Sequence, residues 1–193
     1  MNSLEIIAAV FGVVSVFLSV RQNIWSWPTA IVNVGLYIVV FYEAKLYADT
    51  GLQVIYVVLN AYGWYHWLYG GKNRTGLPVT RTGARLGLFL IALGGIGTAV
   101  IGTFLARSTD AALPYLDAMT TSTSLVAQWM MTRKLLENWL IWVAVDVVYI
   151  GMYIYKSLYV TAVLYFVFLV LSAMGYTKWR QTVADARAEL VPV

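Results

Sequence analysis

Seven apolar stretches divide the sequence, and they limit its possible folds more than any other feature. They cover residues 4–20, 27–43, 46–67, 85–106, 115–132, 138–155 and 158–179. A helix needs about 20 mostly apolar residues to cross the hydrocarbon core of a bilayer. Composition agrees, because 61% of the residues are hydrophobic and only 11% are charged, whereas soluble domains carry roughly 25% charged residues. The sequence therefore predicts an all-α integral membrane protein, with seven transmembrane helices in one transmembrane domain over residues 1–193.

The residue types present exclude several kinds of chemistry. The chain has no cysteine and a single histidine, His66, so it offers neither disulfides nor a cysteine or histidine cluster for a metal. We therefore expect no metal, no cofactor and no enzymatic activity. The first apolar stretch lacks a basic leader and a cleavage pattern, so we interpret it as a retained helix.

The basic residues predict the orientation of the chain in the membrane. One side receives ten of them: Arg21, Lys72, Arg74, Arg81, Arg85, Arg133, Lys134, Lys178, Arg180 and Arg187. The other side receives only Lys45, Arg107 and Lys156. Because cytoplasmic loops carry an excess of Lys and Arg, the N-terminus is expected outside and the C-terminus in the cytoplasm. The loop charges are interpreted as topology signals, not as a nucleic-acid surface.

An internal repeat divides the helices into two groups. The stretch LYADTGLQVIYVVLNAYGWYHW (46–67) aligns without gaps on LYVTAVLYFVFLVLSAMGYTKW (158–179), at an offset of 158 − 46 = 112, with eight of 22 positions identical. The two repeats have the same orientation because an even number of crossings separates them. Two parallel three-helix bundles, 4–67 and 115–179, joined by a linker helix at 85–106, describe a 3+1+3, SWEET-like arrangement, whose site is expected between the repeats.

Polar and aromatic residues recur at helical spacing on four of the predicted helices. Such residues at membrane depth usually face a partner or a water-filled cavity. The candidate positions are Asn33 and Tyr37; Gln53, Asn60 and Trp64; Thr121, Ser124 and Gln128; and Asn138, Trp142, Asp146 and Tyr149. We expect them to line one central cavity between the repeats.

The chemistry of these side chains indicates a flat, polar and cationic substrate. Aromatic rings stack on heterocycles and attract cations, and amides read donor and acceptor patterns. Asp146, near the centre of WLIWVAVDVVYIGMY, supplies one negative charge. A cationic vitamin or nucleoside fits such a cavity better than a lipid, an ion or a nucleic acid. The alternative is that Asp146 is a structural carboxylate, bonded to neighbouring tyrosines.

Two stretches carry a resemblance to a known family. LYADTGLQVIYVVLNAYGWYHW (46–67) and MTRKLLENWLIW (131–142) resemble the PnuC-type transporters, which take up nicotinamide riboside, and the similarity extends over about residues 21–179. The resemblance implies a SWEET-like fold, a homotrimer in the bacterial inner membrane, and facilitated diffusion followed by trapping through a cytoplasmic kinase. It also implies substrate contacts at the following positions: Gln53, Asn60, Asn138, Trp139, Trp142 and Asp146.

Asp146 is also where the chain departs from that family's pattern. Members that carry nicotinamide riboside often have asparagine there, and related subgroups carry thiamine, riboflavin or deoxynucleosides. We expect nicotinamide riboside, with thiamine as the alternative because both are cations. A SWEET-like sugar transporter and a proton-coupled symporter are further alternatives. A retinal protein is disfavoured, because residues 158–177 contain no lysine. An intramembrane hydrolase lacks a serine–histidine pair at membrane depth.

Overall fold

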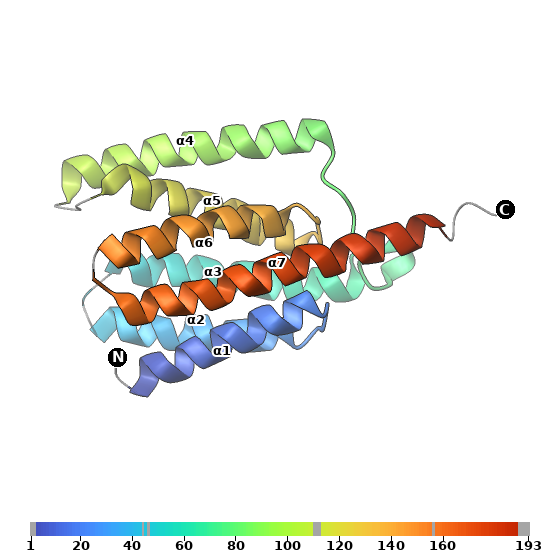
Figure 1. Ribbon diagram of the computed structural model, residues 1–193, viewed down its shortest axis with the longest axis horizontal. Coiled ribbons are helices and arrows are strands. Elements are labelled where there is room, and N and C mark those ends of the chain that lie inside the picture. The colour runs from blue at the N-terminus through green and yellow to red at the C-terminus, as the bar shows by residue number, and fades with distance from the viewer. Residues whose placement is uncertain (1–2, 44, 46, 110–112, 156, 189–193) are drawn as a thin grey trace.

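The chain folds into seven long helices in the order that the sequence predicts. The computed structural model describes residues 3–43, 45, 47–109, 113–155 and 157–188. Within these residues the α-helices (Figure 1) are α1 (Ser3–Val20), α2 (Ser26–Glu43), α3 (Tyr47–Tyr69), α4 (Ala84–Ser108), α5 (Pro114–Thr132), α6 (Asn138–Tyr155) and α7 (Tyr159–Ala188). The expected helices are therefore confirmed. Leu46 and Lys156, which the expectations include, lie outside the described residues, as does the side chain of Arg187.

Four of the helices are long and apolar enough to cross a membrane by length and composition, namely α1, α4, α6 and α7. The other three, α2, α3 and α5, carry more polar residues. In α5, for example, Thr120, Ser122 and Ser124 are all buried. A spanning helix tolerates such side chains where they face other helices. The all-helical fold is thus confirmed, and four of its helices qualify as membrane spans on composition alone.

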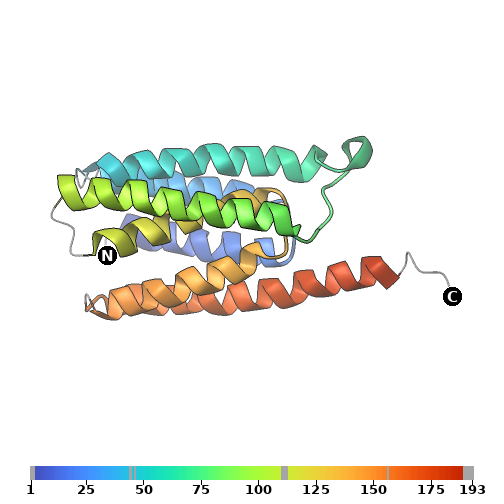
Figure 2. The ribbon, with the colours of Figure 1, turned by 90° about the horizontal axis from the view of Figure 1, so that it is seen from above.

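The helices other than α4 form a closed ring. α1 packs against α2 and α7, α2 against α3, α3 against α5, and α5 against α6, which in turn packs against α7. The order around the ring is therefore α1, α2, α3, α5, α6, α7, so that α5, α6 and α7 follow α1, α2 and α3 in the same order. Figure 2 shows the long axes of these helices running in nearly the same direction. Such a ring encloses an interior that side chains of all six helices can reach.

Residues that lie 112 positions apart have matching surroundings. The rings of Trp27 and Trp67 meet edge to face at 5.2 Å, and those of Trp139 and Trp179 do the same at 5.4 Å. Left-handed backbone occurs at two such pairs as well, Gln22 with Lys134 and Lys45 with Ser157. The offset of 112 thus recurs in packing contacts and in turn geometry, and the paired turn residues are not identical in sequence.

α4 and the end of α7 lie outside the ring. α4 packs against α5, and it exposes large apolar residues such as Leu88, Ile91 and Phe104. α7 continues nine residues past the expected end at Trp179, to Ala188, and Figure 1 shows it projecting beyond the other helices. The expected end was too early because apolar runs stop where a helix leaves the hydrocarbon, whereas a polar helix continues until a residue such as proline ends it.

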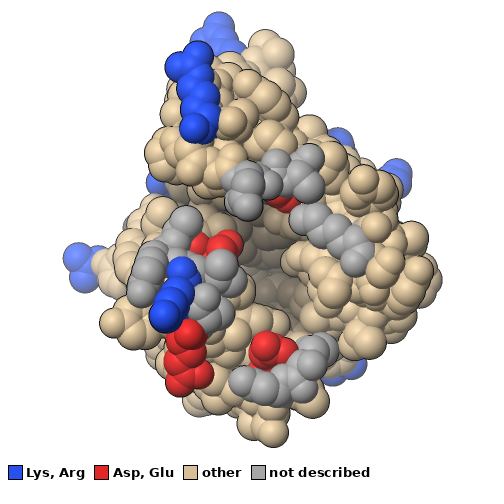
Figure 3. Space-filling model, turned by 90° about the vertical axis from the view of Figure 1, so that its left-hand side faces the viewer, with Lys and Arg blue, Asp and Glu red and all other residues tan. Residues whose placement is uncertain are grey.

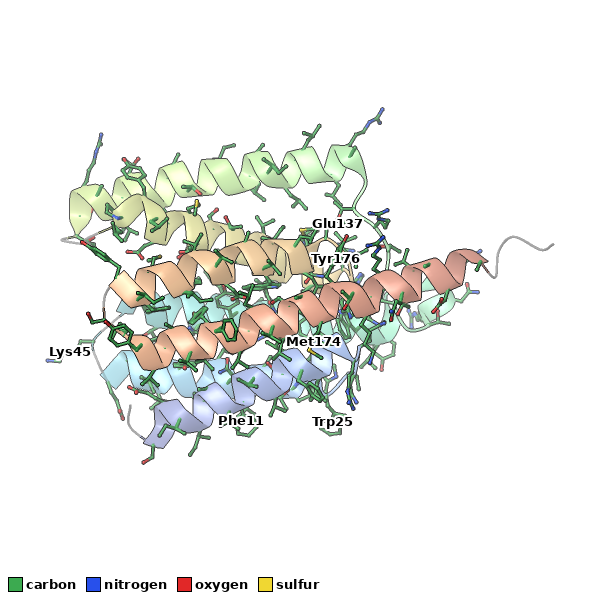
Figure 4. All side chains as sticks on the ribbon, in the orientation of Figure 1. Phe11, Trp25, Lys45, Glu137, Met174 and Tyr176 are labelled. Carbon is green, nitrogen blue, oxygen red and sulfur yellow. The ribbon has the colours of Figure 1, made fainter. Side chains whose placement is uncertain are left out.

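The segment 70–83, which we call the strap, crosses one end of the ring. The backbone N–H of Thr80 donates to the carbonyl of Lys134 at 3.1 Å, and the N–H of Leu136 donates to the carbonyl of Thr80 at 2.8 Å. The carboxylate of Glu137 accepts from the N–H of Thr82 at 2.7 Å and from Nε of Arg81 at 3.2 Å. We call this the strap end; Figure 4 shows Glu137 and Trp25 there and Lys45 at the opposite end.

Lys134 is a buried cation in the turn between α5 and α6. Its side chain is only 8% exposed. Its Nζ lies 4.4 Å from the centroid of the Trp67 ring and donates to Oε1 of Gln22 at 3.5 Å. Burial lowers the pKa of Lys134 from 10.5 to about 8, because an ammonium removed from water loses its hydration. The ring and the amide therefore replace only part of that hydration.

We expect this burial to make the stability of the protein depend on pH above neutrality. The folded protein releases the Lys134 proton near pH 8, and the unfolded chain keeps it up to about pH 10.5. The unfolded state therefore binds more protons between these values, so the free energy of unfolding should rise with pH there, by up to about 3 kcal/mol in total. The Tm of detergent-purified protein, measured between pH 7.5 and 10, should rise more for the wild type than for Lys134→Met. Parallel pH curves for the two proteins would contradict this.

Candidate functional site

The end of the ring opposite the strap is hollowed. Figure 3 views the molecule from this side and shows a depression in the middle of the face, with acidic side chains around it. Glu5, Asp49 and Asp117 lie in the first turns of α1, α3 and α5, and Glu43 is the last residue of α2. We call this the hollow end. A cation approaching from this side meets carboxylates before it meets the interior of the ring.

Asp146 lies inside the bundle, as its surroundings in the sequence require. The side chain is 3% exposed, and its Oδ2 accepts a hydrogen bond from Oγ of Ser172 on α7 at 3.1 Å. A carboxylate has about four acceptor sites. The hydroxyl of Ser172 occupies one of them. The alternative interpretation, a structural carboxylate bonded to neighbouring tyrosines, stays open, and the hydrogen bond that the structure gives Asp146 comes from a serine.

Asn60 and Gln128 join α3 to α5, where the helices α1–α3 meet the helices α5–α7; we call these two groups the halves of the ring. Nε2 of Gln128 on α5 donates to Oδ1 of Asn60 on α3 at 2.7 Å, and Asn60 is 2% exposed. Two amides at this depth need partners, and here they are partners for each other. The remaining donors and acceptors of the pair are of the types that hydrogen-bond the edge of a heterocycle.

Ser124 lies between aromatic residues of opposite halves. Its side chain interacts with Tyr56 on α3 and with Tyr149 on α6. The serine is 4% exposed. Within the described part of the chain, its Oγ makes no hydrogen bond of good geometry. Tyr149 in turn lies 5.8 Å from Tyr153 and 4.7 Å from Tyr165, measured between ring centroids. A polar hydroxyl thus borders a group of aromatic rings.

Four other expected positions are half-buried, as Gln128 and Tyr149 are. Nδ2 of Asn33 donates to the carbonyl of Ala8 on α1 at 2.7 Å, so that this amide ties α2 to α1. Tyr37 stacks on Phe41 with ring centroids 5.5 Å apart. Gln53 and Thr121 are each partly buried, on α3 and α5. The four side chains lie on helices of the ring. Each is partly exposed, so a solute could reach only part of it.

The remaining expected positions lie towards the strap end. Trp139 is 1% exposed and packs edge to face on Trp179, and Trp142 packs against the same cluster. Asn138 is fully buried at the start of α6, where its Nδ2 donates to the carbonyl of Leu135. Trp64 is 39% exposed. The structure therefore buries Asp146, Asn60 and Ser124, and it leaves Gln128 and Tyr149 partly buried in contact with them.

Sequence reasoning missed two residues of this interior. Ser172 donates to Asp146, and Tyr165 packs against Tyr149. Both were overlooked because α7 has no obvious polar stripe. The internal repeat contains the missing signal, since Ser172 lies 112 positions after Asn60 and Tyr165 lies 112 positions after Gln53. Carrying the candidate positions across the repeat would have found both.

The arrangement suits binding more than bond-breaking chemistry. In the described ranges, no group of three or more His, Cys, Asp and Glu residues is placed to hold a metal ion. Surface recesses of about 590 Å³ along the outer end of α4 and about 310 Å³ beside Arg81 and Arg180 lie outside the ring. The interior instead combines one carboxylate, two amides, a hydroxyl and several aromatic rings, which can bind a flat cation by charge, hydrogen bonds and stacking.

Comparison with known proteins places the chain in a family. Residues 2–181 match the family described as nicotinamide mononucleotide transporter. The nicotinamide riboside transporter PnuC of Escherichia coli (strain K12) is 24% identical, over 91% of this chain and 84% of that protein. The riboflavin/roseoflavin transporter RibM of Streptomyces davaonensis is 25% identical, over 91% of this chain and 83% of that protein.

A solved structure is similar as well. The crystal structure of the vitamin B3 transporter PnuC superimposes with a TM-score of 0.75 and 26% identity, covering 94% of this chain and 82% of that one. The family match extends over nearly the whole sequence, and the helical bundle agrees with it. This chain therefore belongs to the nicotinamide mononucleotide transporter family.

Proposed function

We propose that this protein carries nicotinamide riboside across the membrane by facilitated diffusion. The observation that carries the proposal is Asp146, a carboxylate that is 3% exposed and has one serine hydroxyl donating to it, inside a ring of helices. Nicotinamide riboside carries a pyridinium cation, which matches a single buried negative charge. The similarity to nicotinamide riboside transporters supports the same substrate, and the family is one of transporters, not enzymes.

The proposed binding site lies between the two halves of the ring. Asp146 faces the pyridinium charge, the Asn60–Gln128 pair reads the carboxamide and the ribose hydroxyls, and Ser124 and Tyr149 border the aromatic ring. These side chains come from α3, α5 and α6, so the site depends on both halves. The other expected contacts, which surround this group, are Asn33, Tyr37, Gln53, Trp64, Thr121, Asn138, Trp139 and Trp142.

The proposed architecture is the 3+1+3, SWEET-like one, in which α1–α3 and α5–α7 are parallel repeats and α4 is the linker. The matched contacts at an offset of 112, such as the Trp27–Trp67 and Trp139–Trp179 pairs, support it. We propose that the strap end is cytoplasmic and the hollow end external, in the bacterial inner membrane. The exposed apolar face of α4 is consistent with contacts to lipid or to other subunits of a homotrimer.

Transport then requires the two repeats to rock about the bound solute. In one state the hollow end admits the substrate, and in the other the strap end releases it, as in alternating access. In this mechanism no other gradient drives the cycle, so net flow follows the substrate gradient. A cytoplasmic kinase that phosphorylates the imported nicotinamide riboside would keep its free concentration inside low, so that net flow stays inward.

Uptake by proteoliposomes tests this mechanism. We expect labelled nicotinamide riboside to enter until the inside and outside concentrations are equal, at a rate that an imposed proton gradient does not change. Accumulation above the outside concentration that requires the proton gradient would contradict facilitated diffusion and would make Asp146 the candidate proton carrier. Protein-free liposomes provide the control for passive leakage.

Riboflavin is the second candidate substrate, because a relative of 25% identity is a riboflavin/roseoflavin transporter. Riboflavin is neutral and so gains nothing from a buried carboxylate. We expect unlabelled nicotinamide riboside to compete with the labelled compound, thiamine to compete less, and riboflavin and glucose not to compete. Competition by riboflavin alone would replace the proposed substrate but not the site.

A further inference from the structure

Two tryptophans link the halves of the ring at the strap end by crossed hydrogen bonds. Nε1 of Trp67 on α3 donates to the carbonyl of Met131 at 2.9 Å, near the end of α5. Nε1 of Trp179 on α7 donates to the carbonyl of Ser19 at 3.2 Å, near the end of α1. Met131 lies 112 positions after Ser19, and Trp179 lies 112 positions after Trp67. Each half therefore donates to the same position of the other half.

The turns after α1 and α5 hold the two acceptor carbonyls in place. The N–H of Gln22 donates to the carbonyl of Ser19 at 2.9 Å, and the N–H of Lys134 donates to the carbonyl of Met131 at 3.0 Å. Both turn residues have left-handed backbone, with φ of 54° and 48°, a conformation that non-glycine residues adopt at a cost. The side chains of these same residues meet at 3.5 Å. The turns thus add a further contact between the halves at this end.

Four indole rings pack in a row, which we call the tryptophan wall: Trp27, Trp67, Trp139 and Trp179. The central pair, Trp67 and Trp179, meets across the halves with ring centroids 5.9 Å apart, and Trp27 and Trp139 close its two sides. All four side chains are at most 3% exposed. Neighbouring rings in the row are in van der Waals contact, so a solute the size of a nucleoside can pass between them only if they separate.

The wall lies between the polar interior and the strap. Trp67 follows Asn60 by seven residues on α3, and Trp179 follows Ser172 by seven residues on α7. Seven residues are about two helical turns, or roughly 10 Å. The strap covers the other side, where the N–H of Leu77 donates to the carbonyl of Trp67 at 3.1 Å. A solute that leaves the interior towards this end must therefore separate the central pair.

We propose that Trp67 and Trp179 form the barrier that closes the strap end of the transport pathway, and that release of the solute requires both crossed hydrogen bonds to break. This inference rests on the proposed function for its meaning. Its first test does not need a substrate. Because the two bonds occupy equivalent positions, loss of either one should weaken the barrier to the same extent.

Accessibility of a single cysteine tests the barrier directly. The chain has no native cysteine, so Ser124→Cys introduces the sole thiol, two turns before Met131 on α5. In inside-out vesicles, an impermeant methanethiosulfonate reagent should label it slowly in the wild-type background. In Trp67→Phe/Trp179→Phe, which lacks both indole N–H groups, labelling should be at least tenfold faster. Trp25→Phe, whose tryptophan is 65% exposed and points away from the bundle (Figure 4), is the matched control.

Two results of this labelling would overturn the proposal. One is equal labelling rates in the double variant and in Trp25→Phe. That result would mean that Trp67 and Trp179 contribute packing but no barrier. The other is fast labelling of Ser124→Cys in the wild-type background, as fast as Ala186→Cys on the exposed end of α7. If transport of nicotinamide riboside fails but the labelling behaves as expected, the proposed substrate is wrong and the barrier is right.

A cross-link provides a second test that keeps both tryptophans in place. Gln22→Cys and Lys134→Cys place thiols on the two touching turns, one from each half. A short, reducible bis-methanethiosulfonate cross-linker should lower the rate of uptake by proteoliposomes at least tenfold, and reduction should restore the rate. Uptake that continues at the uncross-linked rate would overturn the proposal, even if the double phenylalanine variant proves too unstable to purify.

Discussion

Replacing Asp146 by asparagine should weaken the binding of nicotinamide riboside between ten- and a few hundredfold. The side chain keeps its shape, and an amide oxygen can still accept from Ser172, whose Oγ lies 3.1 Å from Oδ2. What disappears is the negative charge. Two opposite charges about 4 Å apart attract each other by about 4 kcal/mol at an effective dielectric constant near 20. Loss of part of that attraction, about 1.5–3 kcal/mol, corresponds to the expected fall in affinity.

Isothermal titration calorimetry on purified protein measures this effect. Nicotinamide riboside and thiamine, which are both cations, should lose affinity in Asp146→Asn. Asp185→Asn removes an exposed carboxylate from the projecting end of α7, so it serves as the matched control and should change no affinity more than twofold. If Asp146→Asn binds nicotinamide riboside as the wild type does between pH 5 and 8, the carboxylate is structural and the argument from charge fails.

Alanine at Gly63 or Gly175 should destabilise the protein strongly, and by similar amounts. A Cβ atom at Gly63 would lie 2.3 Å from the ring of Trp27, and one at Gly175 would lie 2.5 Å from the ring of Trp139. Both rings are rigid and at most 2% exposed, so neither can move aside. Overpacking of this kind costs about 1–3 kcal/mol. For a chain of this length, that corresponds to a fall in Tm of roughly 2–12 °C.

Glycines with free space around them are the controls for this comparison. A Cβ atom at Gly35 or Gly151 would meet nothing within 4 Å, and alanine favours a helix over glycine by up to about 1 kcal/mol. Gly35→Ala and Gly151→Ala should therefore leave Tm unchanged or raise it. Adding Trp27→Leu to Gly63→Ala should restore part of the lost stability. A Gly63→Ala protein as stable as Gly151→Ala would show that the bundle can adjust, and that the contact is looser than it looks.

The helices could be located from the sequence because burial in a bilayer leaves a direct signal. Each spanning helix needs a long apolar run, and α5 begins at Pro114 as its proline predicts. The end of α7 could not be located in this way, because its last residues are polar and lie beyond the apolar run. The left-handed turn residues Gln22 and Lys134 also gave no signal, since neither is a glycine.

The candidate site could be predicted only as a set of helix faces. Helical spacing places Asn138, Trp142, Asp146 and Tyr149 on one face of α6, but these residues have different surroundings in the structure. Asp146 and Tyr149 face the polar interior, whereas Asn138 lies at the strap end. Spacing along the sequence shows on which side of a helix a residue lies. Whether its neighbour at that depth is polar or aromatic depends on the other helices.

The sequence by itself determined the class of this protein, the number of its helices and the offset of 112 that relates its two groups of helices. These follow from local physics, because a backbone in lipid must bond within its own helix. Only the tertiary structure decided which side chains meet: Gln128 with Asn60, Ser172 with Asp146, and Trp67 with Trp179. Those contacts depend on the order of the helices around the ring, and a single helix contains no information about which helix will pack beside it.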